Sequence, residues 1–510
     1  MDSQSTGAPS VACRNFLALF FAKIRGRTLS RPRHTLPRSA WPWIAEVQVL
    51  EARALLSSAS AAPLGLVPAG AGGTAVTPHF TAAPTGYSPT QLRHAYGFDQ
   101  ISFNGTPGDG TGTTIAIVDA FDDPNIFNSD PNLPNDLHKF DVAFGLPDPP
   151  SFIKLNQFGS TSNLPAPNKG WITEIALDVE WAHAIAPGAK ILLVEANSAS
   201  GADLYQAVDT ARNYPGVNLV SMSWGGRESI FESSLDSHFT TPVGHVGVTF
   251  VVASGDSGAP AEYPSASPNV VSVGGTTLNL DSNGNILSET TWKGSGGGIS
   301  AHEKLPSYQA GLVPGKKPHR ATPDVAYDAD PNTGVGVYDS YNNGTVTPWG
   351  QWGGTSIGAP QWAALFAIAD QGRTLALKGS LDGATQTLPA LYSFSPNDFH
   401  DITTGRSGPP RIAAGPGYDL ATGLGTPIAN LIVADLVSTT ITGPAFAVSG
   451  FTVNGISAES PLAAALKKLP LAQIFVSIEH DHAAALHHAD PVAVHPLLPG
   501  KSHAARGRGR

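Results

Sequence analysis

The sequence predicts an α/β fold with a mostly parallel central sheet and helices on both of its faces. Short apolar runs rich in β-branched residues alternate along the chain with segments of helical periodicity. This alternation is typical of a parallel sheet that is buried on both faces. The composition agrees, because 41% of the 510 residues are hydrophobic and only 14% are charged, with 55 Gly and 43 Pro. Such a chain favours one loop-rich domain of about 350 residues over a disordered polymer.

Five runs predict buried strands, and two segments between them predict helices. The expected strands are 114–119, 190–196, 218–222, 248–254 and 270–273, and the expected helices are 172–184 and 203–213. Asp119, Trp224 and Asp256 come at or just past the ends of expected strands. Because open α/β sheets place their functional sites at the carboxyl ends of the strands, we expect these three residues along one edge of the sheet.

The two ends of the chain differ in composition from its middle. We divide the sequence into a basic, export-type segment at 1–60, an Ala/Gly/Pro-rich linker at 61–85, a folded domain at 86–442 and a histidine-containing tail at 443–510. The tail has no domain pattern, and we expect it to be disordered. The folded domain carries an excess of acidic groups, which argues against nucleic-acid binding. The apolar run at 16–22 is too short to span a membrane.

A turn of small residues at 354–360, with the sequence GTSIGAP, leads directly into an apolar helical run at 361–369. Ser356 is therefore expected near a helix N-terminus, where unpaired backbone N–H groups stabilise negative charge. A nucleophile needs this environment when charge develops on the carbonyl group that it attacks. A serine in such a turn is equally typical of a helix N-cap, so the turn alone does not establish catalysis.

Glu174 and Asp178 stand four residues apart in the expected helix 172–184, which places both carboxyl groups on one helix face. Their neighbours along the helix are mostly apolar. Two carboxylates this close raise the pKa of one of them, so the pair can share a proton and can accept one from a hydroxyl group. A solvated acidic face would show the same spacing. His183, on the same helix, is the alternative base.

Taken in order, these motifs resemble a known family. The turn GTS-x-x-x-P is similar to the nucleophile turn of the subtilisin superfamily, but the His-Gly-Thr-His segment of its ordinary members is absent from this chain. The order Glu-x-x-x-Asp, Ser-Gly-Asp at 254–256, and Gly-Thr-Ser-x-x-x-Pro resembles the sedolisins, the serine-carboxyl peptidases. The resemblance covers residues 87–436 and includes SMSWGG at 221–226, GGGIS at 296–300 and PDVA at 323–326.

The resemblance implies a subtilisin-like fold and a serine-type endopeptidase that acts at acidic pH through an acyl-enzyme intermediate. By position, Ser356 is the nucleophile, Glu174 is its general base, and Asp178 orients Glu174 and shares its proton. Asp256 takes the oxyanion position, where subtilisins have an asparagine. An aspartate donates a hydrogen bond only while it is protonated, so this residue predicts activity in acid.

Two further residues are implied to support the acid pair. Asp119 occupies the position of the subtilisin triad aspartate, and some members of the family link an acid there to the catalytic pair with help from a tryptophan that matches Trp224. An aspartate that ends a strand is equally a plain turn former.

The resemblance also implies one structural calcium ion near the end of the domain. Calcium takes oxygen ligands from carboxylates and backbone carbonyls. The implied ligands are the carboxylates of Asp401 and Asp419 and the backbone carbonyls of Ile402, Gly415 and Gly417.

Two other hypotheses remain open. A catalytically silent surface or adhesion protein would keep the fold and the calcium site. It gains weight because the family is usually made with a long N-terminal prosegment, whereas we expect this chain to fold without one. A subtilisin-type peptidase that uses Asp119, His183 and Ser356 is disfavoured by the missing histidine motif. For the peptidase we expect protein or peptide substrates, no nucleic-acid partner, no membrane span, a monomeric state and a secreted or cell-surface location.

Overall fold

A computed structural model of the chain describes residues 62–63, 67–68, 80–127, 135–313 and 317–439. Every element described below lies between residues 62 and 439. The predicted export-type segment at 1–60 and the histidine-containing tail at 443–510 fall outside the described residues, as does most of the linker at 61–85.

The central sheet confirms the predicted α/β class. Within the described residues it has eight strands, in the order β13-β12-β10-β8-β5-β7-β6, with β16 beside β12. All neighbouring strands are parallel except β12 and β13, which form an antiparallel pair. The strands are β5 (Thr114–Ala120), β6 (Phe152–Asn156), β7 (Lys190–Ala196), β8 (Leu219–Met222), β10 (Thr249–Ala253), β12 (Val270–Leu280), β13 (Ile286–Thr291) and β16 (Val325–Asp328).

The five predicted strands are all present, and the sheet extends beyond them at both ends. The strand β12 runs seven residues further than expected, because its second half pairs with β13. The sequence analysis missed the edge strand β6, which pairs with β7. Only one face of an edge strand needs an apolar side-chain row, so β6 carries Lys154 and Asn156 and lacks the continuous apolar pattern of a central strand.

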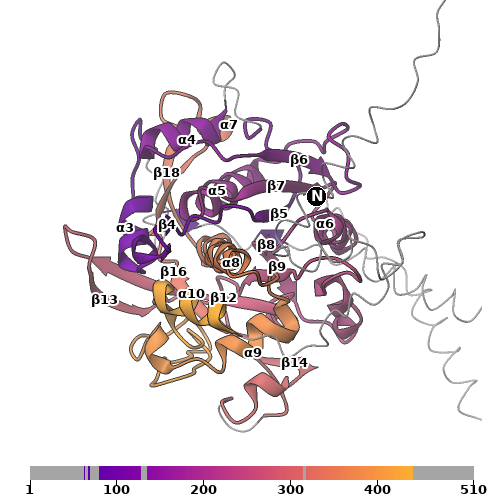
Figure 1. The fold of residues 1–510 in the computed structure, drawn as a ribbon, viewed down its shortest axis with the longest axis vertical. Helices are drawn as coiled ribbons and strands as arrows, with labels where there is room; N and C mark the ends of the chain where they lie inside the picture. The colour runs from indigo at the N-terminus through magenta and orange to yellow at the C-terminus, as the bar shows by residue number, and fades with distance from the viewer. Residues whose placement is uncertain (1–61, 64–66, 69–79, 128–134, 314–316, 440–510) are drawn as a thin grey trace, which may run out of the picture. The chain divides into compact units, whose positions relative to one another are not determined.

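Helices cover the sheet on both faces (Figure 1). Two of them, α5 (Lys169–Ile185) and α8 (Gly358–Leu375), pack against each other and against β5, while α6 (Gly201–Asn213) packs on β5 and β7. Every residue of α5 from Trp171 to Ile185 is buried, as expected for a helix that is apolar on nearly all sides. The remaining helices are α3 (Pro89–Ala95), α4 (Asp136–Phe144), α7 (Ser340–Asn343), α9 (Leu388–Leu391) and α10 (Ala429–Ser438).

Short strands form smaller sheets around this core. One has the order β1-β9-β11, and another has the order β17-β18-β2. Their strands are β1 (Ala62–Pro63), β9 (Trp224–Arg227), β11 (Glu262–Tyr263), β17 (Val335–Tyr338), β18 (Trp349–Gly353) and β2 (Val67–Pro68). Three further pairs are β3 (Ser102–Phe103) with β4 (Thr106–Pro107), β14 (Gly298–Lys304) with β15 (His319–Thr322), and β19 (Phe399–His400) with β20 (Thr426–Pro427).

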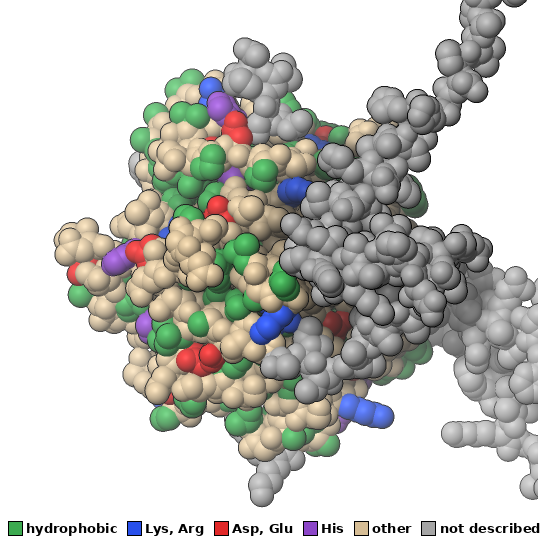
Figure 2. Space-filling view, viewed as in Figure 1, with side chains coloured by type: hydrophobic (Ala, Val, Ile, Leu, Met, Phe, Trp, Pro, Cys, Tyr) green, Lys and Arg blue, Asp and Glu red, His purple; other side chains and the backbone are tan. Residues whose placement is uncertain are grey.

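The described residues on the face shown in Figure 2 include few charged side chains. On the face shown in Figure 2, the Lys and Arg side chains of the described residues lie apart from one another and form no continuous basic patch. No helix in the described part of the chain is long and apolar enough to cross a membrane.

Candidate active site

Glu174 and Asp178 lie one turn apart on α5, and both are fully buried, with 0% of their surface exposed. Burial raises the pKa of each carboxyl group well above its ordinary value, because a charged carboxylate loses its water there. The field of Asp178 raises the pKa of Glu174 further. The solvated acidic face that the spacing alone allowed is therefore wrong, and the pair is suited to holding a shared proton.

Asp119 is the third acid of this cluster. It is buried near the end of β5, where burial raises its pKa to about 7, and its field raises the pKa of both Glu174 and Asp178. Neither of its carboxyl oxygens has a hydrogen-bond partner among the described residues. Trp224 lies close by in β9, but its indole Nε1 donates to the backbone carbonyl of Val118 at 2.8 Å. The tryptophan therefore holds the backbone next to Asp119.

Ser356 lies in the single turn η7 (Thr355–Ile357), which leads into α8. The turn packs against α5 and the ends of β10 and β12. The Ser356 hydroxyl lies within hydrogen-bonding reach of the Glu174 carboxyl group, and this contact lowers the pKa of Glu174 against the effect of burial. The structure thus brings Ser356 to the helix that carries Glu174 and Asp178, although the sequence placed the serine on a separate segment.

Asp256 contacts the same turn from the loop after β10. Its Oδ1 accepts hydrogen bonds from the backbone N–H and the hydroxyl of Thr355, at 2.8 and 2.9 Å. Its Oδ2 has no partner among the described residues, so a proton on this carboxyl group belongs on Oδ2 and is free to be donated. Burial, opposed by the two Thr355 bonds, raises the pKa of Asp256 to about 7.

Gly354 makes this approach of Asp256 to the turn possible. Its φ is +126°, and a Cβ atom at this position would lie 2.8 Å from Asp256 Oδ2. Any larger residue would fill the space in front of the oxygen that can donate a proton. The glycine of the GTS motif therefore lets the turn and Asp256 Oδ2 lie close together.

Ser223 is a positioning residue that the sequence analysis missed. It lies between β8 and β9, is fully buried, and donates its hydroxyl to Asp178 Oδ1 at 2.9 Å. This hydrogen bond lowers the pKa of Asp178, because it stabilises the ionised form. In the sequence, Ser223 lies between the predicted strand 218–222 and Trp224, which suggested a position near the sheet edge. Serine is common at such positions, so the pattern did not identify it as a contact of Asp178.

Replacing Ser223 with alanine is expected to move the acid limb of the pH–rate profile toward higher pH by about one unit. Without the hydrogen bond the pKa of Asp178 rises, so the acid pair stays fully protonated over a wider range and cannot accept the proton of Ser356. The kcat/KM profile for a peptide substrate measures this shift, and Ser223→Thr should restore the limb. Ser221→Ala removes another buried hydroxyl, from β8, and an equal shift in that control would show that the effect is not specific to Asp178.

His183 is not placed to act as the base. It is buried on α5, and its Nε2 hydrogen-bonds the carbonyl of Pro147 at 2.7 Å. Burial lowers the pKa of His183 to about 4, although Asp141 lies 3.4 Å away. These contacts fix the ring at the far end of the helix from Glu174, so the structure gives no support to the histidine-based alternative.

The predicted calcium ligands lie on two segments that meet in space. Asp401 Oδ2 accepts from the backbone N–H of Gly417, and Asp419 Oδ2 accepts from that of Gly415, both at 3.0 Å. Within the described residues, no group of three or more Asp, Glu, His or Cys side chains could hold a metal ion. An ion between these segments would therefore depend on backbone carbonyls, such as that of Ile402, as well as the two carboxylates. This oxygen-only set fits a hard cation such as calcium.

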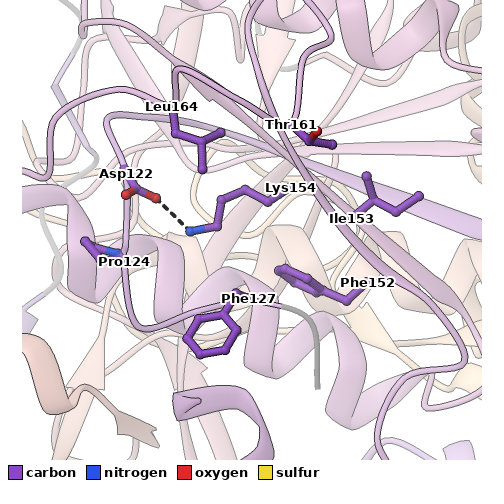
Figure 3. A pocket seen from close by; sticks show the side chains of 8 residues that line it. All are labelled: Asp122, Pro124, Phe127, Phe152, Ile153, Lys154, Thr161 and Leu164. Atoms are coloured by element: carbon purple, nitrogen blue, oxygen red, sulfur yellow. Dashed lines mark hydrogen bonds and ion pairs between the residues drawn. The ribbon is translucent and has the colours of Figure 1, made fainter. Parts of the chain in front are cut away.

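A separate pocket of about 460 Å³ lies beside the edge strand β6 (Figure 3). Its lining residues are Asp122, Pro124, Phe127, Phe152, Ile153, Lys154, Thr161 and Leu164. Lys154 Nζ pairs with Asp122 at 2.7 Å and with Glu195 of β7 at 3.5 Å, so its charge is already compensated. None of the predicted catalytic residues lines this pocket.

Comparisons with known proteins agree with the geometry. Residues 167–380, which contain Glu174, Asp178, Asp256 and Ser356, match the model of the Subtilase family. The chain is 34% identical over 384 residues to kumamolisin from Bacillus sp. (strain MN-32), which covers 68% of this chain and 63% of that protein. It is 32% identical over 261 residues to sedolisin from Pseudomonas sp. (strain 101), covering 45% of this chain and 42% of that protein. The chain thus spans less than two thirds of the length of both relatives.

The solved structures give the same result for the fold. The structure of Pseudomonas sedolisin, a serine-carboxyl proteinase complexed with two molecules of pseudo-iodotyrostatin, aligns with a TM-score of 0.57 and 26% identity. The alignment covers 69% of this chain and 98% of that chain. Together with the mostly parallel sheet and its covering helices, this alignment shows that the fold is subtilisin-like. Fold, motif order and relatives together show that this chain belongs to the sedolisin family within the subtilase superfamily.

Proposed function

We propose that the protein is a serine-carboxyl endopeptidase that hydrolyses peptide bonds of proteins at acidic pH. The observation that carries the proposal is the buried cluster in which the Ser356 hydroxyl reaches Glu174, Glu174 shares a helix face with Asp178, and Asp256 contacts the same turn. Carboxyl groups whose pKa is strongly raised by burial and by neighbouring charges concentrate at catalytic sites.

In the proposed reaction, Glu174 takes the proton from Ser356 Oγ as that oxygen attacks the peptide carbonyl carbon. The protonated Oδ2 of Asp256 donates a hydrogen bond to the oxyanion that forms. Glu174 then returns the proton to the leaving amine, and the C–N bond breaks to give the acyl-enzyme. A water molecule, deprotonated by Glu174, attacks the ester, and the proton returns to Ser356 as the acid product leaves.

The protonation states favour this sequence of steps in acid. The working state needs one negative charge on the pair Glu174 and Asp178, and a proton on Asp256. Since the pKa of Asp256 is about 7, the oxyanion donor is present below this pH and is lost above it. The rate of peptide hydrolysis is therefore expected to be highest below neutral pH.

The first test is digestion of an unfolded protein from about pH 3 to about pH 8 by wild type and Ser356→Ala. We expect cleavage in acid by the wild type and a loss of at least about a thousandfold in the variant. Cleavage by both chains at equal rates would point to a contaminating protease. If neither chain cleaved the substrate, although circular dichroism showed both to be folded, the catalytically silent surface or adhesion protein would be favoured instead.

We also propose one structural calcium ion, held by the carboxylates of Asp401 and Asp419 and by the carbonyls of Ile402, Gly415 and Gly417. The supporting observation is that the carboxylates and the glycine loop already contact each other through backbone hydrogen bonds. The ion would join the two segments and neutralise the carboxylate charge.

Chelation is expected to lower the melting temperature by several degrees, because an ion that binds only the folded state stabilises it. Differential scanning fluorimetry with and without EGTA measures the shift, and calcium added back should reverse it. Asp419→Asn should melt lower and lose the response to EGTA. The control is Asp281→Asn, in a loop remote in sequence, which should keep the change in melting temperature on adding EGTA. The same change in Asp419→Asn as in the wild type would contradict this site.

A secreted or cell-surface location completes the proposal, because an acid medium and free calcium are met together outside the cytoplasm more readily than within it. Recovery of the protein only from the cytosolic fraction of its native cells would contradict this location.

A further inference from the structure

The segment 228–239, which we call the β9 loop, follows β9 directly and packs against β14. It contains two short turns, η3 (Glu232–Ser234) and η4 (Asp236–Phe239), and η3 contacts β14. The strand β9 itself begins next to Ser223, whose hydroxyl bonds Asp178. The β9 loop therefore continues the strand that adjoins the acid pair, but it contributes none of the residues assigned to the candidate active site.

Four carboxyl groups gather where the β9 loop meets β14. Glu228, Glu232 and Asp236 come from the β9 loop, and Glu303 comes from β14. The charges of these groups act on one another. Glu232 and Glu303 are nearly fully buried, with 1% and 3% of their surface exposed. Carboxylates that share a buried place repel each other when all of them are charged, so the cluster favours bound protons.

Two of the four acids are supplied with hydrogen-bond donors. Glu228 accepts from the hydroxyl of Ser300 in β14 and, at 3.0 Å, from the backbone N–H of the next residue. Asp236 Oδ1 accepts from the hydroxyls of Tyr263 and Ser267, at 3.1 and 2.6 Å. Glu228 and Asp236 are therefore prepared as hydrogen-bond acceptors.

The other two acids lie beside these acceptors, and each has a buried oxygen without a donor. Oε1 of Glu232 and Oε1 of Glu303 have no hydrogen-bond partner among the described residues. The carboxyl group of Glu232 lies within hydrogen-bonding reach of Glu228, and that of Glu303 lies within reach of Asp236. Two carboxyl groups bond each other only through a proton on one of them, because ionised carboxylates are acceptors alone. Each pair therefore needs one shared proton, and Glu232 and Glu303 are its carriers.

Burial and neighbouring charge keep these protons bound to unusually high pH. Burial, together with the charge of Glu228, raises the pKa of Glu232 to about 8. Burial, together with the charge of Asp236, raises the pKa of Glu303 to about 7. Both carriers therefore stay protonated through the acid range and lose their protons near neutral pH.

The described surroundings of the cluster offer no cation that could take the place of these protons. None of the four acids forms an ion pair with another described residue. Against the effect of burial, the field of Arg320 in β15 lowers the pKa of Asp236, but the Arg320 guanidinium already pairs with Asp324 at 2.6 Å. Arg227 and Lys304, which adjoin the cluster in sequence, are exposed, and His302 is partly exposed.

The remaining titratable groups around the cluster are Tyr205 of α6, His238 of η4, Tyr263 of β11 and His319 of β15. Burial raises the pKa of both tyrosines, so they stay neutral. Nδ1 of His238 contacts Asp209 at 2.9 Å, and Nδ1 of His319 contacts the backbone carbonyl of Glu303 at 3.1 Å. Each histidine thus has a partner other than the four carboxyl groups.

We propose that the two shared protons form an acid-dependent lock, which holds the β9 loop on β14 at low pH and releases it when the protons are lost. One pair joins η3 to Glu228, which is bonded to β14, and the other pair joins η4 to β14 directly. After both protons are lost, buried carboxylates face each other without a donor between them. The inference goes beyond the proposed peptidase function, because none of these groups takes part in the reaction steps.

The direction of the pH dependence follows from the raised pKa values. The locked state binds its protons more tightly than the released state, in which the carboxyl groups regain their ordinary pKa in water. The lock is therefore at full strength below the ordinary pKa of a glutamate, weakens as the pH rises from there, and is lost above the pKa of about 8 of Glu232.

Hydrogen–deuterium exchange measured by mass spectrometry tests the lock without depending on catalysis. All chains are full length and carry Ser356→Ala, and each exchange rate is divided by the rate of an unstructured peptide at the same pH. We expect the protection of the peptide 228–239 to fall at least about tenfold between about pH 5 and about pH 8. The helix α10, remote from this loop in sequence, should keep its protection.

The variant Glu232→Gln combined with Glu303→Gln separates the shared protons from other causes. A glutamine amide donates to Glu228 or to Asp236 at every pH, so the β9 loop should stay protected within about threefold over the same range. The matched control is Asp370→Asn, which removes an acid on α8 whose pKa burial raises to about 8. It should show the same fall as its Ser356→Ala parent.

Three results would overturn the lock. The first is equal protection of the β9 loop at both pH values in the Ser356→Ala parent. The second is an equal fall in the parent and in the double variant. The third is an equal fall in α10, because the whole domain would then open instead of the loop.

If circular dichroism showed the double variant to be unfolded, the two single variants would take its place. Each should then remove about half of the fall on a logarithmic scale, because the pairs contribute separately. The full fall in both single variants would contradict the proposal.

Discussion

Replacing Glu174 with glutamine is expected to lower kcat/KM for peptide hydrolysis by about a thousandfold or more. Glutamine keeps the shape of the side chain but cannot accept the proton of Ser356, and general base catalysis contributes about 10² to 10⁴ to the rate of such reactions. The substitution also removes a buried group whose pKa is raised by burial and by Asp178. The variant should therefore remain folded, with a melting temperature in acid close to that of the wild type.

Glu180→Gln is the matched control. Glu180 is also fully buried on α5, but its Oε2 accepts a hydrogen bond from the backbone N–H of Tyr338 at 3.0 Å. Because this contact lies away from Ser356, we expect kcat/KM within about tenfold of the wild type. If kcat/KM fell by a similar factor in both variants, the loss would come from changing any buried acid of α5. Such a result would contradict a specific role of Glu174 in proton transfer.

Replacing Asp256 with asparagine is expected to extend activity toward neutral and alkaline pH. The wild-type carboxyl group donates from Oδ2 only while protonated, and its pKa is about 7. At pH 8 about a tenth of the enzyme keeps this proton, so kcat/KM should fall about tenfold for each further pH unit. An amide donates at every pH. Relative to its own acid maximum, the variant should retain about tenfold more activity than wild type at pH 8.

The control for this prediction is Asp370→Asn. Asp370 is buried on α8, the helix that follows Ser356, and burial raises its pKa to about 8. Its Oδ1 accepts from the backbone N–H of Leu381 at 3.0 Å, away from the nucleophile. Its pH–rate profile should follow that of the wild type. Two results would contradict the assignment of the alkaline limb of the pH–rate profile to Asp256. One is a shift of this limb in Asp370→Asn, and the other is an unchanged limb in Asp256→Asn.

Much of the fold followed from local pattern. Strands such as Thr114–Ala120 and Lys190–Ala196 are buried on both faces, so their apolar runs are continuous and visible in the sequence. The edge strand Phe152–Asn156 and the antiparallel half of Val270–Leu280 escaped prediction. Their pairing depends on partners far away in the chain, and partly exposed strands leave weaker patterns.

Motif order and spacing predicted those features of the site that depend on residues close together in the sequence. The four-residue spacing of Glu174 and Asp178 fixes their common helix face, and the small-residue turn fixes Ser356 at a helix start. The spacing could not tell a buried pair from a solvated one, because burial depends on how η7 and the sheet pack against α5.

By itself, the sequence determined which residues could carry acid–base and nucleophilic chemistry, and which elements hold them. The tertiary structure alone decided that Ser223 holds Asp178, that Thr355 occupies one oxygen of Asp256 and leaves the other to donate, and that the linker pairs with β9 and β18. Each of these contacts joins residues separated by 45 or more positions. Local propensity does not encode such pairings, because their geometry is set by the packing of the whole sheet and its helices.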